Sequence, residues 1–265
     1  MTEITPIDIQ DELVALARDF AANEIRPVAA HYDETEDTPW EPFYKAAEIG
    51  LTCYDLPEHL GGGGIMDLTT AARIHEELVF GDAAIGNFIG SASFFAGTVI
   101  ALGDETQQER WVRPLTGPKP KLGALATTEP EAGSDASSIT THAEKVDGGY
   151  RLNGSKTWIS NAGVASYYIV FATVAPGTRS KGITAFIVED GDEGFTVGNK
   201  LHKLGQRAIP THEIFFKDVF LPEDRRIGAE GMGFKGLMRK FDESRVTLAA
   251  GEVGIGRAAF DYAVE

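Results

Sequence analysis

The first third of the chain carries hydrophobic residues at helical spacing. In the range 8–30, Leu13, Leu16 and Phe20 fall close to one face of a helix. Asp67 stands just before another periodic segment, where a helix N-cap is favoured. The segment 83–102 is apolar and rich in small residues, which is typical of a buried helix. The pattern predicts helices at 8–30, 40–50, 67–80, 83–102 and 104–115.

Beyond Lys121 the hydrophobic period changes from helical to alternating, after a boundary rich in proline and glycine at 114–120. The Asn153-Gly154 pair is a strong signal for a two-residue hairpin turn. Because the predicted strands follow one another without intervening helices, we expect an antiparallel barrel or sandwich-like domain. These strands are 122–127, 139–146, 150–152, 156–160, 167–173, 183–189, 195–197 and 212–221.

The helical period returns after residue 231, where Phe234 and Leu237 share one face, and we expect a second helical run from Asp242 onward. The pattern stops at Glu265 without a helix-ending glycine, so we expect the sequence to break off within a helical domain. The predicted fold class is α+β. Its parts are an N-terminal all-helical domain at 1–118, a β domain at 119–228 and the start of a C-terminal helical-bundle domain at 229–265.

Composition narrows the classes of function. The chain has 265 residues, of which 43% are hydrophobic, and a formal net charge of −16. This length is sufficient for more than one domain with its own core. The acidic balance argues against a nucleic-acid partner, which would need a basic surface. An anionic ligand would need lysines or arginines near its site to offset the negative net charge of the protein.

Cysteine and histidine usage give further limits. Cys53 is the only cysteine, which excludes an intrachain disulfide and fits a reducing, cytoplasmic environment. The histidines show no i,i+4 pair and no metal-ligand spacing, so we expect no metal site. The segment Met1–Pro6 lacks the basic-then-apolar order of a secretory signal. We also expect no membrane span, because no uninterrupted apolar run reaches the ~20 residues required.

Two segments carry candidate chemistry. The first, from Leu125 to Asp135, reads LATTEPEAGSD. It is an apolar strand that ends in hydroxyls, followed by a proline stop and a turn of small residues. Backbone amides in such a turn can approach an anion or the edge of a ring. The second segment, from Asn153 to Asn161, reads NGSKTWISN.

On a strand, Trp158 and Ser160 point to one face and Ile159 to the other. A flat indole beside a hydroxyl makes a suitable wall for a flat ligand that forms hydrogen bonds. Taken alone, these residues favour the simpler interpretation that Trp158 belongs to the core, because buried tryptophans are common.

The two segments together resemble the flavin-contacting signatures of the acyl-CoA dehydrogenase family. The first is similar to T-E-P-x-A-G-S-D and the second to N-G-x-K-x-W-I-[ST]-N. Two departures occur: Glu131 stands where the family usually has glycine, and Ile209-Pro210 where it usually has a Ser-Asp pair. The resemblance covers the whole chain and extends to Gly103–Gln107, Lys203–Ala208, Phe216–Val219 and the D-x-x-R element Asp242–Arg245.

The resemblance implies a flavoprotein oxidoreductase of lipid metabolism that uses FAD to oxidise an acyl-CoA thioester to a 2-enoyl-CoA. Electrons would pass to an electron-transfer flavoprotein, and the protein would form a homo-oligomer, a dimer of dimers. Substrate contacts would come from Ser134, Asp242 and Arg245. The alternative for the last two residues is a weak surface pair on a helix, and the motif match favours ligand contact over it. The implied cofactor-binding residues are Leu125, Thr127, Thr128, Ser134, Trp158, Ile159 and Ser160.

The resemblance leaves the catalytic base unassigned. Most of the family uses a glutamate late in the C-terminal domain, beyond the present sequence. A minority uses a glutamate immediately before the arginine of D-x-x-R, and that position here is Ser244. Glu243 lies one residue away, which rotates it by about 100° around a helix. Two alternatives therefore stay open: a flavin-dependent monooxygenase on the same fold, and a non-catalytic partner subunit of a heteromeric dehydrogenase.

Overall fold

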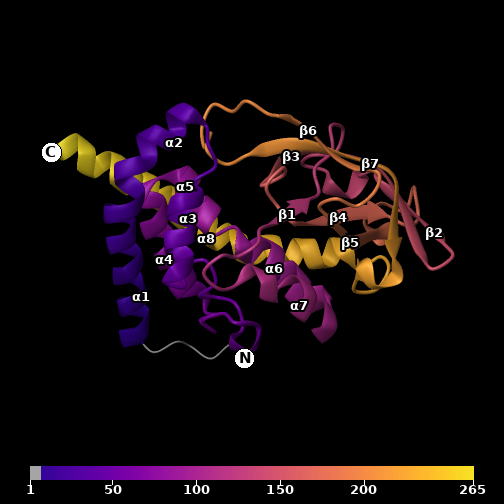
Figure 1. Cartoon of the computed structure of the whole chain (residues 1–265), viewed down its shortest axis with the longest axis horizontal. Helices are drawn as coiled ribbons and strands as arrows, with labels where there is room; N and C mark the ends of the chain where they lie inside the picture. Colours follow the sequence, from indigo (N-terminus) through magenta and orange to yellow (C-terminus); the bar gives the residue numbers. More distant parts are fainter. Residues whose placement is uncertain (1–6) are drawn as a thin grey trace.

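The computed structural model describes residues 7–265. The segment Met1–Pro6, on which the expectation of no secretory signal rests, lies outside the described residues. Figure 1 shows most of the helices gathered at one end of the molecule, the sheet at the other, and the long helix α8 (Gly233–Val264) running along both. The predicted order of helical, β and helical regions is confirmed.

The N-terminal region folds into helices that are joined by short connections, except for the longer segment 49–67 between α3 and α4. The predicted helix at 8–30 is interrupted by a π-turn at Ala21–Ile25 and a 3-10 turn at Arg26–Val28. Pro27 explains the interruption, because proline has no amide hydrogen for a continuous helix. The helices are α1 (Ile7–Phe20), α2 (Ala29–Thr35), α3 (Trp40–Glu48), α4 (Leu68–Gly81), α5 (Ala83–Ile89), α6 (Ala92–Leu102) and α7 (Glu105–Trp111).

Aspartate side chains cap the N-termini of α4, α5 and α7. The Asp67 carboxylate accepts a hydrogen bond from the Thr70 amide at 2.8 Å, so the predicted cap of α4 is confirmed. Asp104 and Gln107 form a reciprocal capping box at the start of α7. The Gln107 amide group also donates to the carbonyls of Asp224 and Arg226, both at 2.9 Å, which attaches the helical region to the β domain.

The apolar segment Ala83–Leu102 is long and apolar enough, by composition, to cross a membrane. By length and composition, it is the one weak candidate for a membrane span among the described residues, against the expectation of none. The segment is divided into α5 and α6 at Gly90, and half of it is buried inside the protein. Phe88 of α5 and Phe95 of α6 belong to the two hydrophobic clusters, so packing within the protein accounts for the apolar composition.

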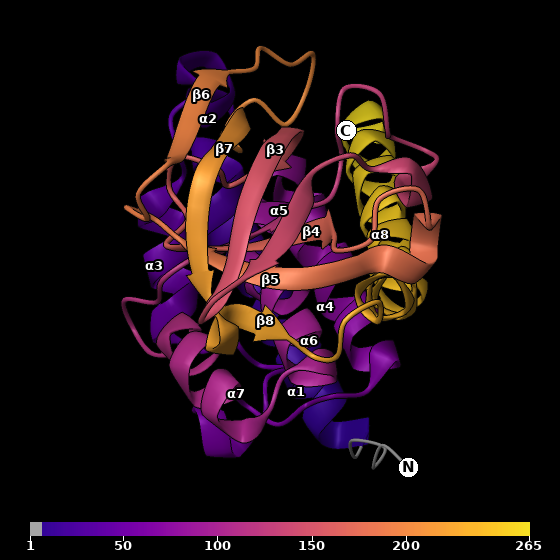
Figure 2. The same ribbon diagram turned by 90° about the vertical axis from the view of Figure 1, so that its right-hand side faces the viewer.

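Among residues 7–265 the sheet runs in the order β6-β7-β3-β2-β4-β5-β8, with β1 paired to β4, and it does not close into a barrel. Two pairings, β1 with β4 and β2 with β4, are parallel, so the sheet is mixed where the sequence predicted antiparallel pairing alone. Figure 2 shows β3 and β7 side by side. The strands are β1 (Gly123–Ala126), β2 (His142–Val146), β3 (Gly149–Ser160), β4 (Tyr167–Thr173), β5 (Ile183–Glu189), β6 (Phe195–Lys200), β7 (Thr211–Pro222) and β8 (Arg226–Ile227).

The hairpin turn expected at Asn153-Gly154 is not present, because β3 runs continuously through both residues. The turn between β2 and β3 is instead Asp147-Gly148, with Gly148 at φ +77°. Gly154 has φ +141° at an irregularity opposite β7, and a β-carbon there would lie 2.6 Å from the Thr141 hydroxyl. The Asn-Gly signal therefore marks a bulge where another segment approaches closely.

The C-terminal helices expected before and after Asp242 form one uninterrupted helix of 32 residues, α8. The hydroxyls of Ser244 and Thr247 bond back to carbonyls three positions earlier, so neither residue breaks the helix. Along its length α8 packs against α4, α6 and β5. One hydrophobic cluster joins α1–α5 to one face of the sheet, and a second joins α6, α7 and α8 to the opposite face of β4 and β5, so the sheet holds both helical regions.

Candidate functional site

The fold brings the two candidate segments into direct contact. Thr128 follows the end of β1, and its carbonyl accepts a hydrogen bond from the Thr157 amide of β3 at 2.9 Å. The Thr127 carbonyl accepts a hydrogen bond from the Lys156 ammonium at 3.0 Å. Residues separated by about thirty positions in sequence therefore form one continuous surface.

A bulge in β3 turns Trp158 outward. Lys156 pairs with Ile214 of β7 and Ile159 pairs with His212, so β3 carries one extra residue between these pairs. Trp158 lies in this bulge at φ +60°, a conformation that residues with a β-carbon seldom adopt.

The exposures of the neighbouring side chains show the result. Trp158 is 58% exposed and Ile159 only 2%, while Ser160 is exposed. The predicted arrangement, with Trp158 and Ser160 facing away from Ile159, is confirmed. The alternative interpretation of Trp158 as a core residue is wrong.

An open pocket of about 270 Å³ lies against the exposed indole. This volume is below the usual range for a whole ligand, so the pocket would take only part of one. Trp158 and Ser160 of β3 line one part of this pocket, and residues of the Lys203–Thr211 segment line the rest. The lining residues are Trp158, Ser160, Lys203, Gly205, Gln206, Ile209 and Thr211.

Backbone and lysine contacts hold the Lys203–Thr211 segment in place. The Lys203 ammonium donates to the Ile209 carbonyl at 2.6 Å and to the Thr211 hydroxyl at 2.8 Å. The Pro210 carbonyl accepts from the Asn161 amide at the end of β3 at 2.8 Å. The unusual Ile209-Pro210 pair is thus held in place through its two backbone carbonyls. Other side chains at these two positions could leave the same contacts in place.

Lys203 supplies positive charge in a strongly acidic protein. Burial lowers the pKa of this ammonium to about 8, and the like charge of Lys200 acts in the same direction. Two of its three N–H groups can be assigned to the contacts with Ile209 and Thr211. Lys203 therefore leaves a donor available on the side of the pocket, where an anionic or carbonyl group of a ligand would be favoured.

The Thr127 side chain is 6% exposed, and its hydroxyl oxygen has no hydrogen-bond partner among residues 7–265. Buried hydroxyls are normally paired, because desolvation without a partner is costly. Thr128 and Leu125 are half-buried beside it, and Ser134 is exposed in the turn that follows. Glu131 is exposed in the same turn, so its charge faces solvent.

Beneath this surface lies an ion pair whose role sequence reasoning missed. Lys156 donates to a carboxylate oxygen of Glu129 at 2.8 Å, with side-chain exposures of 0% and 4%. Burial opposes ionisation of Glu129, but the Lys156 charge and the hydrogen bonds it accepts lower the pKa of this carboxyl to about 2. Burial lowers the pKa of Lys156 to about 8 in spite of its partner. The sequence did offer a signal for this pair: Glu129 follows the uncharged predicted strand 122–127, and Lys156 is the only charged residue of the predicted strand 156–160.

Two of the three proposed substrate residues, Asp242 and Arg245, lie on α8, and Ser134 lies in the turn after β1; none of the three lines the pocket. Asp242 and Arg245 form an ion pair at 3.2 Å, with side-chain exposures of 74% and 69%. This geometry is the surface pair that the sequence allowed as an alternative. Their contact with a substrate stays a prediction.

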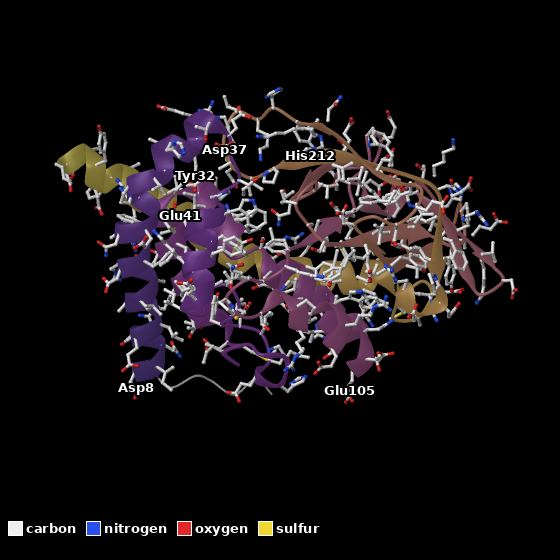
Figure 3. All side chains as sticks on the ribbon, in the orientation of Figure 1. Asp8, Tyr32, Asp37, Glu41, Glu105 and His212 are labelled. Atoms are coloured by element: carbon white, nitrogen blue, oxygen red, sulfur yellow. The ribbon has the colours of Figure 1, made fainter. Side chains whose placement is uncertain are left out.

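A larger open depression of about 410 Å³ lies elsewhere, lined by His59, Leu60, Glu105 and Glu109. Figure 3 places Glu105 at the opposite edge of the molecule from His212, the β7 partner of Ile159. The depression contains none of the predicted site residues, and its two carboxylates would repel an anionic ligand. We therefore locate the candidate site at Trp158.

Comparison with known proteins gives a consistent result. Models of the acyl-CoA dehydrogenase N-terminal and middle domains match residues 8–117 and 124–219. The short-chain specific acyl-CoA dehydrogenase of Homo sapiens is 38% identical over 253 residues, which cover 95% of this chain and 61% of that protein. The chain thus spans about 60% of the length of the curated relatives it matches.

Solved structures extend the comparison to the fold. Butyryl-CoA dehydrogenase from Megasphaera elsdenii superposes with a TM-score of 0.92 at 38% identity, covering 99% of this chain and 69% of that one. The FAD complex of PigA superposes with a TM-score of 0.89 at 27% identity, covering 99% and 69% of the two chains. The arrangement of helices, sheet and long final helix is therefore shared with these proteins.

Proposed function

Because the chain belongs to the acyl-CoA dehydrogenase family, we propose that it binds FAD and acts in the α,β-dehydrogenation of an acyl-CoA thioester. The names of its relatives favour a short acyl chain. The observation that carries the proposal is the exposed indole of Trp158, which lines an open pocket together with Ser160.

The residues present fit a flavin. The exposed Trp158 indole offers a flat apolar surface of the kind on which an aromatic ring stacks. The buried Thr127 hydroxyl, which has no partner among residues 7–265, offers a donor and an acceptor in the first candidate segment. The polar groups of Ser160 and Lys203 lie in the pocket itself, where they can meet the polar rim of the ring.

FAD, when bound, would supply the acceptor for the hydride that leaves the β-carbon. The chain's own residues would bind and orient the flavin and the thioester. The Ser160 hydroxyl would donate a hydrogen bond to the electron-rich edge of the ring. A fixed hydrogen-bond donor stabilises a reaction most where negative charge develops. Asp242 and Arg245 would contact the thioester ligand from α8 if their surface pair opens.

Dehydrogenation also needs a base for the α proton, and we assign none among residues 7–265. Ser244, which precedes Arg245, is 5% exposed, and its hydroxyl donates to the Phe241 carbonyl at 3.2 Å. Glu243 lies on the solvent side of α8, with ion-pair contacts to Arg239 and Lys240 at 3.7 Å.

The proposal is tested by cofactor and substrate titration of the purified protein. Incubation with FAD is expected to turn the protein yellow and to quench flavin fluorescence. Anaerobic addition of butyryl-CoA is expected to decrease the visible flavin absorbance, whereas free CoA is expected to leave it unchanged. A thioester-induced spectral shift without bleaching would support ligand binding but contradict turnover by this chain. Protein that stays colourless with FAD would contradict the whole proposal.

The partners follow from the same proposal. Electrons would pass to an electron-transfer flavoprotein, the protein would assemble as a dimer of dimers, and it would act in the cytoplasm. Reduction of an added electron-transfer flavoprotein in the presence of acyl-CoA tests the first point. Sedimentation equilibrium tests the second, because a mass other than four chains would contradict it.

A further inference from the structure

The proposed chemistry makes no use of the Glu129–Lys156 ion pair, although Lys156 lies two residues before Trp158 on the same strand. Lys156 is on β3, Glu129 is in the loop after β1, and both side chains are almost completely buried. Removing two charges from water costs several kcal/mol for each ion. A pair of well-packed apolar side chains would often be as stable, so stability alone is a poor explanation for it.

Both carboxylate oxygens of Glu129 accept hydrogen bonds from neighbouring segments of the β domain. One oxygen of Glu129 accepts from the Thr140 amide at 2.6 Å and from the Thr140 hydroxyl at 2.8 Å. The other accepts from the Thr141 amide at 2.9 Å and from Lys156 at 2.8 Å. Lys156 donates in addition to the Thr127 carbonyl. The pair thus joins the end of β1, the start of β2 and the middle of β3.

The position of Lys156 within β3 links these contacts to the orientation of Trp158. It is the last residue in regular register with β7 before the bulge that contains Trp158. A bulge changes the direction of the side chains that follow it, and its location depends on what fixes the strand on either side. On the other side, Asn161 is fixed to the Pro210 carbonyl.

We infer that the buried Glu129–Lys156 pair is a positioning device that sets the separation between the two predicted flavin-contacting segments and directs Trp158 out of the sheet. Hydrogen bonds to fixed donors and acceptors specify a distance and an angle, which apolar contacts do not. The inference rests on the proposed function for the identity of the ligand. The positioning itself is a property of this chain with or without a ligand.

The test uses a double variant that removes both charges and keeps the volume, Glu129→Gln with Lys156→Met. A single substitution would leave an uncompensated buried charge and would destabilise the whole domain. The matched control is Arg225→Met with Asp192→Asn, which removes another partly buried ion pair of the same domain, at 3.4 Å. Arg225 also contacts Glu189 at 3.3 Å, and Glu189 keeps its ion pair with Arg110 in this control. Thr140→Ala removes one donor to Glu129 and perturbs the pair more gently.

The first measurement is amide hydrogen exchange of the FAD-free protein. In the double variant we expect exchange at 127–132 and 156–161 to accelerate by about tenfold, which corresponds to about 1.4 kcal/mol of lost protection. The control should leave these segments unchanged. Unchanged exchange there, or an equal increase over the whole sheet, would overturn the inference. If the double variant does not fold, Thr140→Ala decides, with a smaller increase expected in the same segments.

The second measurement is the FAD dissociation constant, from flavin fluorescence. We expect it to rise by about tenfold in the double variant and to stay unchanged in the control. A rise of equal size in both variants would contradict the inference. Failure of the wild-type protein to bind FAD would contradict the proposed function instead, and the hydrogen-exchange result would then judge the positioning role alone.

Discussion

Gly254 of α8 lies against the backbone of Glu76 in α4 so closely that a β-carbon at position 254 would be 2.3 Å from the Glu76 carbonyl oxygen. Arg257, one turn further along α8, forms ion pairs with Glu76 and Glu77. The two helices are therefore fixed to each other by a backbone contact with charged contacts beside it. This crossing fixes the C-terminal half of α8 against α4.

Gly254→Ala is expected to destabilise the protein. The added methyl group cannot fit without moving α8 away from α4, and overpacking of this kind costs about 1–3 kcal/mol. Gly256→Ala is the matched control, because nothing lies within 4 Å of the position that a β-carbon would take there, and alanine favours a helix over glycine by about 1 kcal/mol. Urea unfolding should give free-energy changes of opposite sign. A stabilised Gly254→Ala variant would contradict the close crossing.

Trp158→Ala is expected to weaken FAD binding with little effect on folding. Its indole is 58% exposed, and surface substitutions usually change the free energy of unfolding by less than about 0.5 kcal/mol. Loss of an aromatic contact should cost about 0.5–1.5 kcal/mol of binding energy. Trp111→Ala gives the opposite pattern, because Trp111 is 1% exposed and its removal should cost about 3–5 kcal/mol of stability. Thermal unfolding and flavin titration of both variants check this contrast.

Acid stability should depend on Glu129. Its pKa is about 2 in the folded protein, below the ordinary value of about 4.3 in an unfolded chain. The stabilisation from its charged form is fully present above about pH 4.3 and is lost as the pH falls toward 2, on the order of 3 kcal/mol. The Glu129→Gln, Lys156→Met double variant should lack this loss. Asp135→Asn, at an exposed pair with Arg179, should resemble wild type; equal acid profiles of all three proteins would refute the assignment.

Arg245→Ala is expected to separate binding from stability. Its pair with Asp242 is exposed, so its loss should change the free energy of unfolding by no more than about 0.5 kcal/mol. If Arg245 contacts the thioester, the dissociation constant for butyryl-CoA should rise by about tenfold, since hydrogen bonds to a charged group contribute about 1.5–3 kcal/mol. Calorimetric titration checks this. Arg239→Ala, another exposed arginine on α8, is the control, and equal affinities for both variants would leave Arg245 as a surface residue.

Some features follow from short stretches of sequence. The Asp67 cap, the helical periods and the alternation around Ile159 depend on neighbours within a few residues, so sequence patterns predict them. The change from helical to strand period marked the β region in the same way. The two long signatures carried the family, because each preserves both residue types and spacing over many positions.

Other features depend on partners that are distant in the chain. Glu129 and Lys156 meet across 27 positions, and only the paired strands bring their charges together. The break at Gly90, the uninterrupted α8 and the parallel pairing of β4 likewise depend on which elements pack beside them.

The sequence by itself determined the order of helical and β regions and the family, since these are carried by patterns of neighbouring residues. Only the tertiary structure decided that Asn153-Gly154 forms a bulge rather than a turn, and that a second bulge directs Trp158 outward above a buried ion pair. The physical reason is that register and burial result from contacts between segments, and a strand's own residues do not specify its partner.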